Sequence, residues 1–143
     1  MENKNVLIVN DHPKELEDLV RDMNQLLRNQ DQLQGEAVGA LSGEDAIDLV
    51  EKGPRDFQFA VVDQDLGSGM DGIETTRKLV DLRTDLYVLV YTRVPSDDPE
   101  MIAKFKYEAL AAGAYRYLER GSEGQAPKEI HDFVAAMDQL RRL

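Results

Sequence analysis

The chain has 143 residues, no cysteine and a formal net charge of −11. This length predicts one domain over residues 1–143, and the missing cysteine excludes disulfides, thiolate nucleophiles and cysteine metal sites. The negative charge argues against direct binding to nucleic acid, which is itself a polyanion. No apolar run approaches the roughly 20 residues of a membrane helix, and the first residues do not resemble a signal peptide. We therefore expect a cytoplasmic protein that does not enter a membrane.

Five short segments predict β-strands. They cover residues 6–9, 35–41, 59–62, 87–91 and 115–118, and the run at 35–41 is the weakest. An unbroken apolar run between turn residues is typical of a strand that is buried on both faces of a parallel sheet.

Apolar residues at helical spacing predict a helix after each strand. The first helix begins at Pro13, and the polar run at residues 28–34 ends it. Ser42 and Asp45 resemble a capping box at the start of the second helix, which Gly53 closes. The last helix begins near Pro127. Five strands alternating with five helices predict an α/β fold, a doubly wound parallel sheet in a three-layer sandwich.

Polar residues follow four of the predicted strands. Asn10 and Asp11 end the first strand, Asp63 the third, Thr92 the fourth and Arg120 the fifth. In a parallel sheet these strand ends share one edge, where ligands bind. Carboxylates with carbonyl oxygens suit Mg²⁺, and a hydroxyl with a guanidinium suits a phosphoryl group. An aspartate beside Mg²⁺ can act as a nucleophile and form an aspartyl phosphate.

Each of these residues also has a purely structural interpretation. Asp11 could cap the helix that begins at Pro13. Thr92 could be an ordinary strand-end residue, and Tyr117 an ordinary core aromatic. Asp63 has no comparable capping role, and a buried carboxylate without a partner is costly. The functional interpretation therefore rests most firmly on Asp63. Glycines 67, 69 and 72 would let the chain turn sharply beside it.

Three segments together resemble the receiver domain of two-component response regulators. They are residues 6–13, residues 61–63 with 70–74, and residues 112–118. The resemblance covers nearly the whole chain and implies a flavodoxin-like sheet with strand order 2-1-3-4-5.

The same resemblance implies a role for each matching residue. Asp63 would be the phosphoacceptor, and Asp11 would bind Mg²⁺ together with Asp63 and the backbone carbonyl of Asp65. Thr92 would contact the phosphoryl group. Tyr117 would be the aromatic residue whose rotamer reports the phosphorylated state.

Two positions depart from the family pattern. Asn10 stands where an acidic residue is usual, and it would reach the metal through a water molecule. Arg120 and Gly121 replace the usual lysine and cis-proline. Arg120 can still contact phosphate, but with a different reach and geometry. The segment from Thr92 to residue 113 is also longer than is usual in the family.

The resemblance implies a signalling switch rather than an enzyme, with at most self-phosphorylation from small donors and autodephosphorylation. Its partners would be a histidine kinase or phosphotransfer protein. A second copy could bind the face formed by the fourth helix, fifth strand and fifth helix.

Two alternatives remain open from the sequence. A pseudo-receiver would signal through protein contacts without phosphorylation, which Asn10, Arg120 and Gly121 favour. A haloacid-dehalogenase-type phosphatase would use an Asp-x-Asp motif such as residues 63–65. That motif lies on the first core strand of such phosphatases, whereas here it follows the third.

Overall fold

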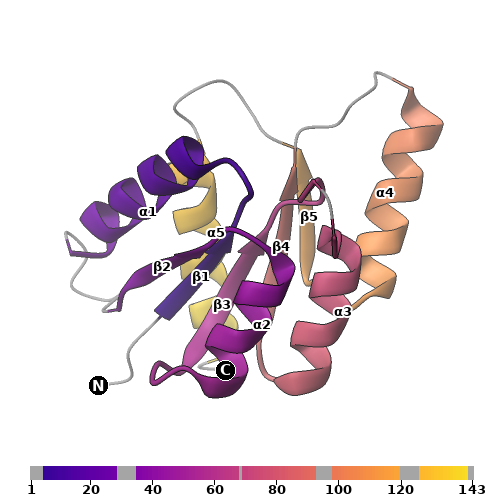
Figure 1. The fold of residues 1–143 in the computed structure, drawn as a ribbon. Helices are drawn as coiled ribbons and strands as arrows, with labels where there is room; N and C mark the ends of the chain where they lie inside the picture. The colour runs from indigo at the N-terminus through magenta and orange to yellow at the C-terminus, as the bar shows by residue number, and fades with distance from the viewer. Residues whose placement is uncertain (1–4, 29–34, 68, 93–97, 120–125, 142–143) are drawn as a thin grey trace.

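The computed structural model describes residues 5–28, 35–67, 69–92, 98–119 and 126–141. Strands and helices alternate along the chain (Figure 1). In chain order the elements are β1 (Asn5–Val9), α1 (Pro13–Arg28), β2 (Ala37–Ala40), α2 (Gly43–Lys52), β3 (Phe57–Val62), α3 (Gly72–Leu82), β4 (Tyr87–Thr92), α4 (Pro99–Ala111), β5 (Arg116–Glu119) and α5 (Ala126–Arg141). The weakly predicted second strand is confirmed, although it is shorter than the predicted segment 35–41.

The five strands form one parallel sheet in the order β2-β1-β3-β4-β5. Helices α1 and α5 cover one face, and α2, α3 and α4 cover the other (Figure 1). The predicted doubly wound, flavodoxin-like sandwich is therefore confirmed. All five strands run in one direction, so their carboxyl ends share one edge of the sheet.

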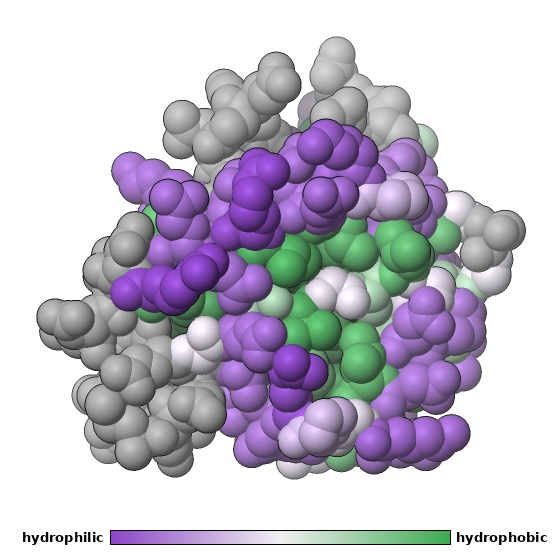
Figure 2. Space-filling model, turned by 60° about the vertical axis from the view of Figure 1, so that its left-hand side comes forward, coloured by the Kyte–Doolittle hydropathy of each residue, from purple (hydrophilic) through white to green (hydrophobic). Residues whose placement is uncertain are grey.

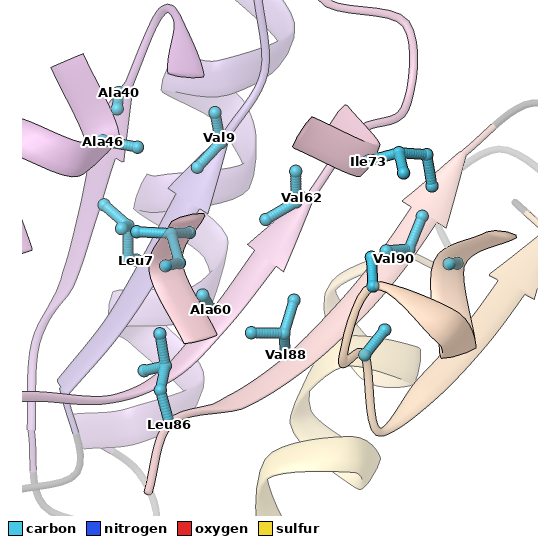
Figure 3. Packing of buried hydrophobic residues seen from close by; sticks show 14 of the residues in the cluster. Leu7, Val9, Ala40, Ala46, Ala60, Val62, Ile73, Leu86, Val88 and Val90 are labelled. Atoms are coloured by element: carbon cyan, nitrogen blue, oxygen red, sulfur yellow. The ribbon is translucent and has the colours of Figure 1, made fainter. Parts of the chain in front are cut away.

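Alternate strand residues divide the apolar core into two layers. Leu7 and Val9 of β1 point to the same face as Val62 of β3 and Val90 of β4, toward α2 and α3 (Figure 3). Val6, Ile8, Phe59, Val61 and Leu89 face α1 and α5. Such apolar continuity on both faces is what a parallel strand needs when helices cover both sides of the sheet.

Local sequence fixes the start of α2. The Ser42 hydroxyl accepts a hydrogen bond from the backbone N–H of Asp45 at 3.1 Å, as the predicted cap requires. The helix ends at Lys52, and the N–H of Gly53 donates to the Leu49 carbonyl at 3.1 Å. Both predicted ends of this helix are therefore confirmed.

The outer strand β2 leaves apolar surface uncovered. Leu41, which follows it, is 45 % exposed, and Val38 and Ile47 are only partly buried. The strand lies on the side that Figure 2 turns toward the viewer, where apolar surface is bordered by hydrophilic side chains.

Helix α4 is the least buried of the five helices in the described part of the chain. Ala109 is its only buried residue, while Met101, Tyr107 and Leu110 are exposed. No helix in the described ranges is long and apolar enough to cross a membrane.

Candidate functional site at the strand ends

Asp63 lies directly after β3, at the centre of the sheet. Its backbone N–H donates to the Val9 carbonyl at 3.0 Å, so the β1–β3 ladder extends to this residue. Because Val9 pairs with Val62, Asn10 and Asp63 follow the ends of two neighbouring strands. Asp63 is only 7 % exposed, which places a carboxylate in a largely desolvated position.

Among the described residues, Thr92 and Asp65 donate hydrogen bonds that orient the Asp63 carboxylate. The hydroxyl of Thr92, the last residue of β4, donates to Asp63 Oδ1 at 2.9 Å. The backbone N–H of Asp65 donates to the same oxygen at 3.2 Å. Thr92 is buried, so its bond to the carboxylate is shielded from water. The sheet therefore brings together a carboxylate and a hydroxyl that lie 29 positions apart.

Asp11 presents an oxygen that lacks a donor. Its Oδ1 is buried and has no hydrogen bond from the described residues. The ring nitrogen Nε2 of His12 lies 3.6 Å from Asp11 Oδ1, beyond hydrogen-bonding distance. Asp11 accepts no hydrogen bond from the first turn of α1 in the part of the chain described. The alternative that it caps this helix therefore has no support, and an acceptor without a donor suits a cation instead.

Asn10 is almost completely buried, and its side chain bonds to a backbone group two residues away. Its Oδ1 accepts the backbone N–H of His12 at 2.9 Å, which closes the turn that leads into α1. The sequence did not predict this bond. A carboxylate at position 10 could accept the same N–H, so the turn itself does not require an amide.

The glycines of the following loop serve two different needs. Gly67 and Gly69 have φ angles of +70° and +97°, as a sharply turning loop requires. Gly72 has no positive φ; instead, a β-carbon there would lie 2.3 Å from the Asp63 carbonyl oxygen. Its N–H donates to the Gln64 carbonyl at 3.0 Å. Gly72 is therefore required because the start of α3 touches the backbone of the Asp63 segment.

Tyr117 lies on β5 with its ring in the core beside α3 and α4. The residue is 8 % exposed, and its hydroxyl is buried with no hydrogen bond from the described residues. Burial raises the pKa of this phenol, and the charge of Glu119 raises it further. The predicted phosphoryl contact Arg120 and its neighbour Gly121 lie outside the described residues.

The donor set fits a magnesium ion better than a metal that needs many protein ligands. Within the described ranges, no three His, Cys, Asp or Glu side chains form a metal cluster. Asp11 and Asp63 offer carboxylate oxygens, and the Asp65 backbone can offer a carbonyl. Mg²⁺ typically keeps several waters and binds through one or two protein carboxylates, so this smaller set is compatible with it.

Two residues at this edge were missed by the sequence reasoning. Asp71 caps α3 by accepting the N–H of Glu74 at 2.8 Å, which its spacing from Glu74 could have indicated. Glu44 of α2 accepts the N–H of Met70 at 3.0 Å. Glu44 and Met70 are 26 positions apart, and no sequence pattern predicts that they interact.

The solved structures similar to this chain share its fold. A CheY-like response regulator receiver domain protein from Methanospirillum hungatei JF-1 is 22 % identical, with a TM-score of 0.74 over 99 % of this chain and 98 % of that one. The N-terminal domain of a response regulator/sensory box/GGDEF 3-domain protein from Carboxydothermus hydrogenoformans is 21 % identical, with a TM-score of 0.70 over 98 % and 100 %. A BeF3-activated DrrB receiver domain is 19 % identical, with a TM-score of 0.69 over 99 % and 100 %.

Sequence comparison identifies the family. A search of curated proteins returned no significant match. The family model described as the response regulator receiver domain matches residues 6–132, which is most of the chain. The strand order, the aspartate after β3 and this match agree, and the chain belongs to the response regulator receiver domain family.

Proposed function

We propose that residues 1–143 form a single cytoplasmic receiver domain that switches state when Asp63 is phosphorylated with the help of Mg²⁺. The observation that carries the proposal is the buried Asp63 carboxylate, which accepts a hydrogen bond from Thr92. Asp11 follows the end of the neighbouring strand β1, and its Oδ1 has no hydrogen bond from the described residues. Its partner would be a histidine kinase or a phosphotransfer protein, as membership of this family implies.

The transfer is a displacement at phosphorus. An oxygen of Asp63 forms the new P–O bond while the P–N bond of the donor phosphohistidine breaks. The imidazole leaves with the electron pair of that bond and is reprotonated from water. Mg²⁺, held by Asp11, Asp63 and the Asp65 carbonyl, would neutralise charge on the phosphoryl oxygens.

Side chains of this chain then stabilise the product. The Thr92 hydroxyl, which donates to Asp63 Oδ1 at 2.9 Å, is placed to donate to a phosphoryl oxygen instead. Arg120 would offer a second contact. In that exchange Thr92 would lose its bond to Asp63 and could move. The movement would pass along β4 to Tyr117 on β5, because Val90 of β4 pairs with Tyr117.

The output surface would be formed by α4, β5 and α5. Met101, Tyr107 and Leu110 of α4 are exposed there, and so is Tyr115 just before β5. Exposed apolar side chains of this kind suit docking of a partner or of a second copy.

Intact-mass spectrometry after incubation with acetyl phosphate and Mg²⁺ tests the proposal. The wild type should gain one phosphoryl group and Asp63→Asn none. Asp65→Asn is the matched control, because it removes a neighbouring charge but keeps an oxygen for the Gly67 N–H, which Asp65 Oδ1 accepts at 3.2 Å.

Three other results would contradict the proposal. A labelled Asp63→Asn protein would place the acceptor elsewhere. An unlabelled wild type would favour the pseudo-receiver, which Asn10 supports because it adds no charge where the family usually has an acidic residue. Release of phosphate over many turnovers from a generic phosphomonoester would favour the phosphatase alternative.

A further inference from the structure

The loop between β3 and α3 is held mainly at its two ends. Near its start, the Asp65 N–H bonds to Asp63 and the Gly67 N–H bonds to Asp65. At its far end, the Gly72 N–H bonds to the Gln64 carbonyl. All of these bonds join residues of the loop segment to one another. They therefore do not fix the loop relative to the rest of the protein, which contacts with other elements must do.

Glu44 supplies such a contact from the first turn of α2. Its Oε1 accepts the Met70 N–H at 3.0 Å. Among the described residues, this is the only side-chain hydrogen bond from another element to residues 66–70. The bond also lowers the pKa of the Glu44 carboxyl below its ordinary value, as expected when the charged form accepts a backbone N–H.

The surroundings of this bond leave little space for another side chain. A β-carbon at Gly69 would lie 3.4 Å from Glu44 Oε1. A β-carbon at Gly43 would lie 2.1 Å from the Thr75 hydroxyl oxygen and 3.2 Å from Met70 Sδ. The start of α2 is thus packed directly against Met70 and the first turns of α3, which lie on the same face of the sheet (Figure 1).

The same loop touches the proposed metal site at its other end. A β-carbon at Gly67 would lie 2.9 Å from Asp11 Oδ2. Gly67 is three residues before Met70 and two after Asp65, whose carbonyl is a proposed metal ligand. A displacement of Met70 would therefore be transmitted within a few residues to Asp11 and to the Asp65 carbonyl.

We propose that Glu44 is a positioning residue for the Mg²⁺ site, acting through the Met70 N–H to hold the β3–α3 loop against Asp11. The proposal rests on the proposed function, since it assumes that Mg²⁺ binds at Asp11 and Asp63. Glu44 touches neither the metal nor the reacting atoms. Its effect is to fix the distance between the Asp65 carbonyl and the carboxylates before the metal arrives.

The test is an NMR titration with Mg²⁺ at one ionic strength, on the wild type and three variants. Glu44→Ala should weaken Mg²⁺ binding about 10-fold, the lower end of the effect of groups that orient metal ligands. Glu44→Gln should restore binding close to that of the wild type, because its amide oxygen can still accept the Met70 N–H. Asp45→Ala is the control, since it removes an exposed carboxylate from the same helical turn.

The three variants separate a hydrogen bond from a charge effect. Equal Mg²⁺ affinity in Glu44→Ala and the wild type would overturn the proposal. Loss of affinity to the same extent in Glu44→Gln or in Asp45→Ala would also overturn it, because charge alone would then explain the effect.

The metal-free spectra distinguish failure of this inference from failure of the proposed function. If the wild type binds no Mg²⁺, the proposed function fails and so does the role assigned to Glu44 in the metal site. If the wild type binds Mg²⁺, the Gly67 amide resonance of the metal-free protein should move in Glu44→Ala and return in Glu44→Gln. A Gly67 resonance that is unchanged in Glu44→Ala would overturn the inference while leaving the proposed function intact.

Discussion

The side-chain amide of Asn24 makes both hydrogen bonds that a neighbouring strand would make to Ala37. Asn24 Oδ1 accepts the Ala37 N–H at 2.8 Å, and Asn24 Nδ2 donates to the Ala37 carbonyl at 3.1 Å. Ala37 begins β2, one of the two edge strands of the sheet, and Asn24 belongs to α1. A helix side chain therefore covers part of an edge that would otherwise be open to pairing with another chain.

Removing this amide should destabilise the protein. Asn24→Ala leaves a partly buried N–H and C=O without their partners, so we expect the free energy of unfolding to fall by about 1–3 kcal/mol. Urea denaturation followed by circular dichroism measures this. Gln25→Ala, at the exposed neighbouring position of the same helix, should change the midpoint little. Equal midpoints for the two variants would show that water replaces the Asn24 bonds without loss.

A carboxylate at position 10 should strengthen Mg²⁺ binding. Asn10→Asp adds a negative charge beside Asp11 and keeps an oxygen for the His12 N–H, which Asn10 Oδ1 accepts at 2.9 Å. We expect affinity to rise about 10- to 100-fold if the side chain acts through a bound water. Calorimetric titration of both proteins at one ionic strength measures the change. Affinity that is equal or weaker in Asn10→Asp would show that this position is not near the metal.

An alanine at position 72 should disturb the acceptor segment. The new β-carbon would lie 2.3 Å from the Asp63 carbonyl oxygen and 2.5 Å from Gln64 Cα, so the backbone must move. We expect a loss of about 1–3 kcal/mol in unfolding free energy, as for other overpacked sites, with slower labelling by acetyl phosphate. Glu74→Ala, on the exposed side of the same helical turn, is the control. Wild-type stability in Gly72→Ala would mean that α3 can shift without strain.

The Glu44 carboxylate should add stability only while it is ionised. Its pKa is lowered from an ordinary value of 4.5, first by the Met70 N–H and to a smaller extent by Ser42 and the charge of Lys78. A lowered pKa in the folded state means that the stabilisation is fully present above about pH 4.5 and is lost as the pH falls through the folded-state value. The stability difference between the wild type and Glu44→Gln should therefore shrink between pH 5 and pH 3. A difference that stays constant over this range would contradict the assigned cause.

Phosphorylation should change the surroundings of α4 and β5 more than those of α1. Thr92 ends β4, β4 pairs with β5, and α4 has only Ala109 buried among its described residues, so little packing opposes its movement. Amide resonances from residues 101–117 should shift more on treatment with acetyl phosphate and Mg²⁺ than those from residues 16–27. The reverse pattern would move the output surface to the other face of the sheet.

Much of this architecture was determined by the sequence alone. Uninterrupted apolar runs such as residues 6–9 and 59–62 are typical of strands buried on both faces, and the helical stripes between them indicate a parallel sheet. The approach of Thr92 to Asp63 followed from the same reasoning, because the carboxyl ends of parallel strands share an edge. These inferences hold because periodicity and strand direction are properties of the backbone, which is common to every such sheet.

Only the tertiary structure decided the contacts that hold the site and the edge in place. The bonds from Asn24 to Ala37 and from Glu44 to Met70 join residues 13 and 26 positions apart through side chains on helices. Gly72 was predicted as a turn glycine, but it is needed because α3 touches the Asp63 backbone. The physical reason is that such contacts depend on how far each helix is rotated and shifted over the sheet. Apolar periodicity selects the face that a helix buries, but it does not select which polar atom at its margin meets a partner.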